Sequence, residues 1–248
     1  MFAFKYEHSY TSWLGLMRLV ARIVILLLAT GLLMQSAQAR NRLTVLSAEE
    51  RRDNYYTALR KVFHRLYDDD VVLSMICAPG SVEENTAGVL RAARNYEAFS
   101  LWPSTSVWVS VRDSNTRPHR APTNYPAIKV SMQRRPLSTH LAERIDRVWR
   151  ERVSVALRAP ELTDEERGFW SFDGLARYYT ARLKNRTWFT VLGRTRGERS
   201  DAADMNDLAL ALQGYAAGAF SAADLEKALG RLERKRPNPE VSFRRSPE

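Results

Sequence analysis

The clearest hydrophobic pattern along this chain is helical and follows Ser47. Between Tyr55 and Leu66, apolar residues recur at steps of three and four, the spacing that places them on one face of an α-helix. Ser47 and Glu50 fit a capping box, in which both side chains accept backbone N–H groups that the helix start leaves free. The acidic triplet 68–70 should follow the end of this helix, because carboxylates are repelled by the negative end of the helix dipole.

After the acidic triplet, the pattern changes to short apolar runs that are separated by turn residues, as in strands. The run 71–77 fits either continued helix or a buried strand, because periodicity does not separate the two. Short strands are predicted at Thr86–Arg91, Tyr96–Leu101 and Ile128–Met132. The first two of these surround a turn at 92–95.

A strand is also expected at 102–111, either as an extension of the preceding strand or as a strand of its own. Val107, Val109 and Val111 recur at every second position, as in a half-buried strand. Pro103 must then lie at an edge or a break, because proline has no N–H to donate to a ladder.

Three further helices are predicted in the second half of the chain. Ser138 can cap the first of them, and its apolar stripe should face the core: Leu141, Ile145, Val148, Trp149 and Val153. The other two cover Asp204–Ala217 and Ser221–Arg234. Gly218 separates these two helices, and Ser221 and Asp224 repeat the capping motif.

A hairpin is predicted between the first of these helices and the last two. Two β-favouring runs, Leu175–Leu183 and Arg186–Leu192, are separated by Lys184-Asn185, and such a two-residue connection is a hairpin signal. That turn would place Tyr179 opposite Thr190. Both faces of the pair then carry apolar bulk, which predicts either an interior pair covered on both sides or a sheet with one face in an interface.

This order of elements predicts the fold class. Helices lie at both ends and in the middle, and no strand-helix repeat is present, which favours α+β with a mostly antiparallel sheet of about four to six strands. We expect one domain over 40–234 and a disordered tail at 235–248. A division of this domain would fall at 112–127.

The amino-terminal segment predicts export. Its apolar run, 23–34, is shorter than the roughly 20 residues that a membrane-spanning helix needs, so no permanent span is expected. Two arginines precede the run, and small residues follow it at the positions that a signal peptidase reads. We predict a signal peptide at 1–39, cleaved after Ala39, and a periplasmic or secreted product. Met17 is an alternative start, and an uncleaved anchor is the alternative interpretation.

Positive charge is uneven along the chain, which carries a formal net charge of +10. The segment 112–135 contains one acid, Asp113, and the following basic residues: Arg112, Arg117, Arg120, Lys129, Arg134 and Arg135. Prolines indicate a loop at 112–127. In an exported protein, this loop would meet anionic lipid, acidic glycan or an acidic protein rather than nucleic acid. A solvated loop without a partner is the alternative.

Aromatic residues provide a second candidate surface. In an unbroken strand, Trp102 and Trp108 would share a face, where they could stack on a sugar or on a partner's side chain. The segment 169–174 forms a second aromatic cluster around Trp170. Core packing is the alternative for both groups, since a chain without a disulfide needs large apolar side chains inside.

Signals for catalysis are few. The sequence contains no phosphate-binding glycine loop, dinucleotide fingerprint, paired-cysteine metal motif or nucleophile elbow. The single cysteine, Cys77, lies in an apolar run without a basic neighbour, which predicts a buried and unreactive thiol. His140 and Glu143 could share a helix face, but a third ligand is missing, so we predict neither a metal site nor a cofactor.

The leading hypothesis is an exported, non-catalytic protein that binds another macromolecule, either an envelope protein or an acidic surface of lipid or glycan. Its candidate binding residues are Trp102, Trp108, Arg117, Arg120, Arg134, Arg135 and Trp170. The alternative is an envelope hydrolase that acts on glycan or peptide, with Glu166 or Asp173 as acid or base. Further carboxylates available for such chemistry are Glu83, Glu84 and Glu165. A structural subunit with an obligate partner is a third hypothesis.

Overall fold

The computed structural model describes residues 43–78, 83–115, 127–158, 176–182, 188–194 and 201–235, which all belong to one compact unit. In chain order, the elements are β1 (Leu43–Val45), α2 (Ala48–Arg52), α3 (Asn54–Val62), η1 (His64–Tyr67), β2 (Val71–Ala78), β3 (Asn85–Ala92), β4 (Asn95–Pro103), α4 (Val107–Asn115), β5 (Val130–Leu137), α5 (Thr139–Arg158), β6 (Ala176–Arg182), β7 (Trp188–Arg194), α7 (Asp201–Ala216) and α8 (Ala222–Arg234). None of the helices in these ranges is both long and apolar enough to cross a membrane. The predicted leader at 1–39 and the predicted tail after Lys235 lie outside the described residues.

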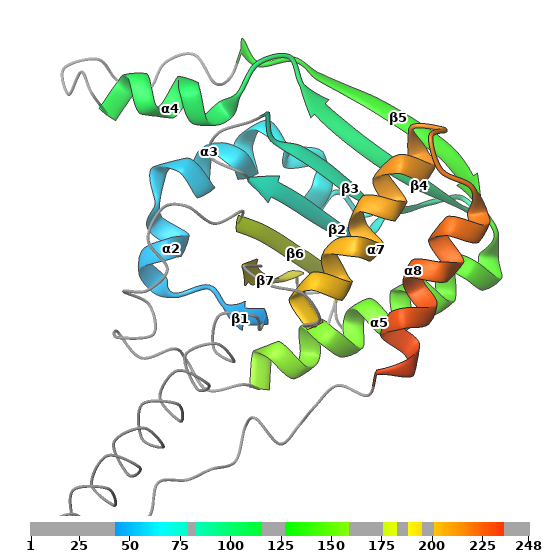
Figure 1. Cartoon of the computed structure of the whole chain (residues 1–248). Helices are drawn as coiled ribbons and strands as arrows, with labels where there is room; N and C mark the ends of the chain where they lie inside the picture. The colour runs from blue at the N-terminus through cyan, green and yellow to red at the C-terminus, as the bar shows by residue number, and fades with distance from the viewer. Residues whose placement is uncertain are drawn as a thin grey trace, which may run out of the picture. The chain divides into compact units, whose positions relative to one another are not determined.

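The strands form one antiparallel sheet in the order β1-β7-β6-β2-β3-β4-β5 (Figure 1). This arrangement confirms the predicted α+β class, although the sheet has seven strands rather than four to six. β1 has no counterpart among the predicted strands, and it pairs with β7 over three residues. The run 71–77, which fitted two interpretations, belongs to β2 at the centre of the sheet.

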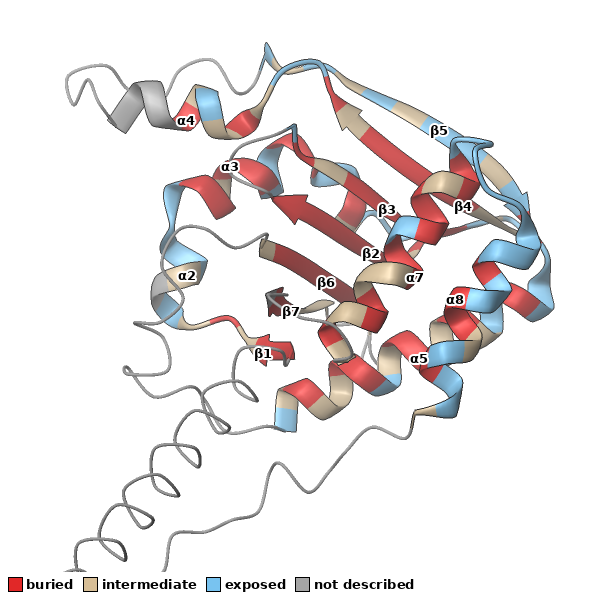
Figure 2. Ribbon diagram, viewed as in Figure 1, coloured by how far each residue is buried: buried red, intermediate tan, exposed pale blue. Residues whose placement is uncertain are grey.

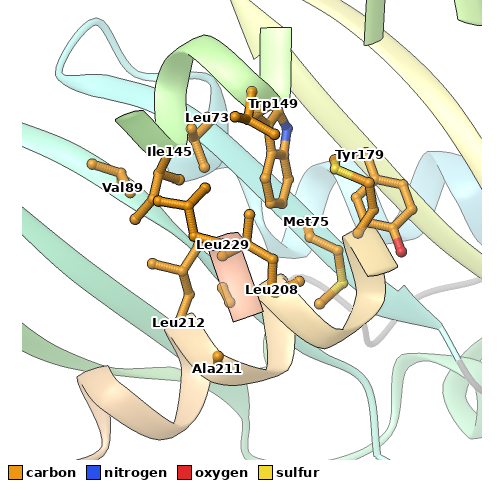
Figure 3. Close-up of a cluster of buried hydrophobic side chains, with 14 of the residues drawn as sticks. Leu73, Met75, Val89, Ile145, Trp149, Tyr179, Leu208, Ala211, Leu212 and Leu229 are labelled. Atoms are coloured by element: carbon orange, nitrogen blue, oxygen red, sulfur yellow. The ribbon is translucent and has the colours of Figure 1, made fainter. Parts of the chain in front are cut away.

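Both faces of the sheet are covered. One face, which we call the α5 face, packs against α5, α7 and α8, and the other, which we call the α3 face, packs against α3, η1 and α4 (Figures 1 and 2). On the α5 face, Trp149 of α5 and Leu208 of α7 meet Leu73 and Met75 of β2 (Figure 3). The predicted core stripe of α5 is confirmed, since all of its members are buried: Leu141, Ile145, Val148, Trp149 and Val153.

Local capping signals are reproduced in the structure. The Ser47 hydroxyl accepts the N–H of Glu50 at 3.1 Å, and the Glu50 carboxylate accepts the N–H of Ser47 at 2.8 Å. Ser221 and Asp224 form the same box at the start of α8. Gly218 follows α7 with a φ of 78°, a left-handed conformation that glycine adopts without strain. The predicted break between the last two helices is therefore confirmed.

The first predicted helix is divided into two. α2 ends at Arg52, and the Asp53 carboxylate then accepts the N–H of Tyr55 at 3.2 Å, which starts α3. Helical structure continues through η1 and ends before the acidic triplet, as the sequence predicts.

The strand predicted at 102–111 is wrong beyond its first residues. β4 ends at Pro103, and α4 follows. Val107 and Val111 are buried, whereas Val109 between them is 55% exposed. The two buried valines lie four residues apart, and this spacing places them on one face of a helix as well as on one face of a strand. Pro103 lies beyond the last pairing of β4 with β3, so its predicted position at a strand break is confirmed.

The hairpin of β6 and β7 forms in a different register from the predicted one. Tyr179 lies opposite Val191, a shift of one residue, because the connection between the strands is longer than two residues. Gly193 accommodates this register, since a Cβ there would lie 2.6 Å from Cε2 of Tyr179. Tyr179 and Val191 are buried on the α5 face, and Tyr178 and Leu192 on the α3 face, so an interior pair covered on both sides is confirmed.

Candidate binding surface

The structure distributes the predicted binding residues over three elements. Trp102 lies in β4, Trp108 lies in α4, and Arg134 and Arg135 lie in β5. Five other candidates lie outside the described residues: Arg117, Arg120, Trp170, Glu166 and Asp173. The described candidates therefore have to be assessed by where these three elements place them.

The tryptophans do not form a shared patch. Trp102 lies on the α5 face, because it follows the buried residue Ala98 of that face by an even number of positions along β4. Trp108 packs on the α3 face, with its ring 5.0 Å from the ring of Tyr55. The prediction that the two tryptophans share a face is wrong, because it depended on an unbroken strand. Both side chains are half-buried, so packing accounts for part of each ring.

A buried carboxylate holds the start of α4. Glu84, just before β3, is 0% exposed. Its Oε1 accepts the hydroxyl groups of Tyr55 at 2.7 Å and Ser106 at 3.2 Å. The backbone N–H groups of Val107 and Trp108 donate to Oε2 at 2.8 Å and to Oε1 at 2.7 Å. These N–H groups belong to the first turn of α4, so Glu84 caps this helix from a distant part of the chain.

The same contacts limit what Glu84 can do. Both of its oxygens are occupied as acceptors and the side chain is buried, so the carboxylate is not presented to a substrate. Burial, together with the neighbouring Glu84 charge, raises the pKa of Tyr55, whose hydroxyl therefore remains a donor at neutral pH. The sequence indicates Glu84 only as one of several carboxylates, because its partners come from elements that the fold brings together.

The sheet has two edges of different length. β1 has three residues, whereas β5 has eight. Within the described ranges, no strand pairs with the outer side of β5. Figure 2 shows exposed and half-buried positions along β5, next to the largely buried strand β4. Free backbone groups on a long edge can pair with another chain, which makes β5 the strongest candidate for a binding surface in this part of the molecule.

Alternate residues of β5 direct their backbone groups outward. The carbonyl of Lys129 accepts the N–H of Ser104 at 2.7 Å, so the odd-numbered positions of β5 face β4. The N–H and C=O groups of Val130, Met132 and Arg134 therefore point away from the sheet. This orientation could not be predicted from the sequence, since it depends on the pairing of β4 with β5.

The carboxyl-terminal end of this edge is closed. Pro136 occupies a position whose backbone groups point outward, but proline has no N–H to offer. Its carbonyl accepts a hydrogen bond from the Tyr215 hydroxyl at 2.7 Å. Arg135 secures the same corner, since its guanidinium lies 4.4 Å from the Tyr215 ring centre and donates to the carbonyl of Phe220 at 2.9 Å. Among the described residues, no strand pairs with the outer side of Val130–Arg134, a stretch that we call the open β5 edge.

Positive charge accompanies the open β5 edge. The predicted basic loop is helical at 112–115, and Arg117 and Arg120 lie outside the described residues. Arg134 and Arg135 belong to β5, and Lys129 directly precedes it. Lys129 is exposed at one end of the edge, and Arg134 lies at the other with 45% of its side chain exposed. Oε2 of Glu97 lies 3.7 Å from the Arg134 guanidinium, and this oxygen is buried although the Arg134 side chain is not.

Cys77 is buried, as the sequence predicts, and burial raises the pKa of its thiol. Its cross-strand partner on β6 is Arg177, a neighbour that the sequence around the cysteine does not reveal. No group of three or more His, Cys, Asp and Glu residues that could hold a metal ion occurs within the described ranges.

No family model, curated protein or solved structure matches this chain. The open β5 edge therefore has to be interpreted from its own geometry and charge. Glu84, a buried carboxylate with four hydrogen bonds, is committed to the start of α4.

Proposed function

We propose that this protein is exported and acts without catalysis, by binding an acidic macromolecule at the open β5 edge. The observation that carries the proposal is a long edge strand with positive charge, whose outward backbone groups have no strand partner among the described residues. Export depends on the predicted leader, with cleavage after Ala39 and release to the periplasm or beyond. Acidic proteins, anionic lipids and acidic glycans are the partners available in that location.

Electrostatics support an acidic partner. The chain has a formal net charge of +10, and part of it lies on β5 through Arg134 and Arg135 and directly before β5 through Lys129. The ion pair of Arg134 with Glu97 is long, and 45% of the Arg134 side chain is exposed, so a carboxylate or phosphate of a partner can reach this guanidinium. Complementary charge accelerates association and selects among partners.

The test uses the chain from Arg40 and three immobilised probes: poly-L-glutamate, phosphatidylglycerol vesicles and heparin. Binding is measured at low and high salt, because exposed charges are screened by salt. The double variant Lys129→Glu and Arg134→Glu reverses charge at the open β5 edge. The matched control, Arg65→Glu and Lys227→Glu, makes the same change in net charge at exposed positions elsewhere.

We expect salt-sensitive binding to at least one probe. The edge variant should weaken it about tenfold or more, whereas the control variant should stay close to the unmodified chain. Equal weakening by both variants would mean that net charge, and not this surface, determines binding. Absence of binding to every probe would contradict the proposed function itself.

A further inference from the structure

We infer that the partner contributes an extended, acidic polypeptide segment that pairs with β5 as an eighth strand of the sheet. This inference rests on the proposed function and specifies the chemistry of its partner. A lipid or glycan would use only the positive charge of the surface. A peptide backbone would also satisfy the N–H and C=O groups of the open β5 edge.

The backbone of β5 provides the first argument. Val130, Met132 and Arg134 present donors and acceptors at every second residue, which is the spacing that an added strand requires. The ladder has a defined end, because Pro136 lacks an N–H and Tyr215 occupies its carbonyl. Closure at this end limits the partner strand to the open β5 edge and its immediate flanks.

The side chains of β5 provide the second argument. Val130 and Met132 pack partly against the core of the α3 face. Arg135, at an odd position, lies on the α5 face, and Lys129, which precedes the strand and bonds to Ser104, continues the same alternation. Residues directly opposite each other in a strand pair share a face. The partner therefore needs apolar side chains beside Val130 and Met132, and acidic side chains beside Lys129 and Arg135. A segment in which acidic and apolar residues alternate meets both requirements.

One register in which a second copy of this chain could pair with the same edge is disfavoured by charge. An antiparallel pair of β5 strands centred on Met132 would place Lys129 of each copy opposite Arg135 of the other. Like charges directly opposite each other destabilise a strand pair. This register of self-pairing is therefore disfavoured, whereas an acidic strand meets the positive charge favourably, a difference that favours an acidic partner.

The test measures Kd for the labelled peptide acetyl-EVEVEVE-amide and the chain from Arg40. In the expected register, the valines pair with the open β5 edge, so a peptide N-methylated at its valines keeps the charge but loses the N–H donors. Met132→Pro removes an outward N–H at an edge position, where proline is tolerated, as it is at position 136. Met132→Leu is the matched control, because it keeps both the N–H and the apolar side chain.

We expect the peptide to bind the unmodified chain and Met132→Leu, and to lose about tenfold or more in affinity with Met132→Pro or after N-methylation. N-methylation tests the same hydrogen bonds with the unmodified protein, should Met132→Pro fail to fold. Equal binding of both peptides would overturn strand addition but leave acidic binding in place. Binding of phosphatidylglycerol vesicles or heparin without binding of the peptide would also overturn strand addition by an acidic peptide. So would a dimer of the unmodified chain in analytical sedimentation that is absent in Met132→Pro. Failure of every acidic probe would instead refute the proposed function.

Discussion

Replacement of Glu84 by glutamine tests whether this buried carboxylate holds α4 in place. The two side chains have nearly the same size, so packing is retained, but one acceptor oxygen becomes an amide donor. With the amide oxygen at the Oε1 position, the bonds from Tyr55, Ser106 and Trp108 remain. The amide nitrogen then meets the N–H of Val107, which donates to Oε2 at 2.8 Å in the native protein.

Two losses determine how far Glu84→Gln lowers the free energy of unfolding. The N–H of Val107 becomes a buried donor without a partner, at a cost of about 1–3 kcal/mol. The three remaining bonds lose a charged acceptor, and hydrogen bonds to neutral groups contribute less than those to charged ones. We expect Glu84→Gln to lower the free energy of unfolding by about 2–4 kcal/mol. Tyr55→Phe removes the hydrogen bond to Glu84 and keeps the ring contact with Trp108. We expect this substitution to lower the free energy of unfolding by about 1–2 kcal/mol.

Urea unfolding of the chain from Arg40 measures both effects, provided that the m-value is unchanged. The two substitutions affect one shared hydrogen bond, so the double variant should lose about 1 kcal/mol less than the sum of the single losses. A loss below about 0.5 kcal/mol for Glu84→Gln, or full additivity of the two losses, would refute this role of Glu84.

Two further predictions concern the helices of the α5 face. Arg152 is buried, pairs with Asp201 at 2.8 Å and donates to the carbonyl of Leu232 at 2.9 Å. Arg152→Met should therefore lower the free energy of unfolding, measured in urea, by about 3 kcal/mol. An unchanged urea midpoint would contradict this role of Arg152. A hydrogen bond from Arg144 lowers the pKa of Glu233 from its ordinary value of 4.5. The ionised Glu233 therefore contributes stability that is fully present above pH 4.5 and is lost as the pH falls through the lowered pKa. The Tm advantage of the unmodified chain over Glu233→Gln should therefore shrink between neutral pH and about pH 3, and a constant difference would oppose this assignment.

Elements with strong local signals could be predicted from the sequence. The capping boxes at Ser47 and Ser221 depend on residues three positions apart, so neighbouring residues alone determine them. The stripe of α5 is long enough for the helical period to exclude a strand. The α+β class followed from the order of such elements along the chain.

Elements determined by distant contacts could not be predicted. Val107 and Val111 fit both periods, and it is the distant carboxylate of Glu84 that caps α4. The register of β6 and β7 depends on a connection longer than the expected turn and on the space that Gly193 leaves for Tyr179. In both cases the deciding interaction joins residues far apart in the sequence or in different strands.

The candidate surface was predicted in part. Arg134 and Arg135 stood out because charge can be read from composition, and the structure places both on an edge strand. The backbone groups of Val130 and Met132 have no sequence signal, because their orientation follows from the pairing with β4. The predicted tryptophan pair was wrong, since Trp102 and Trp108 belong to different elements.

The most direct test of the open β5 edge is residue-resolved amide hydrogen exchange by NMR, with and without acetyl-EVEVEVE-amide. In the free chain, the amides of Ser131, Gln133 and Arg135 should exchange slowly because they face β4, while the amides of Val130, Met132 and Arg134 exchange fast. On addition of the peptide, we predict that Val130, Met132 and Arg134 become protected. Unchanged fast exchange at these three residues under saturating peptide would contradict the central claim.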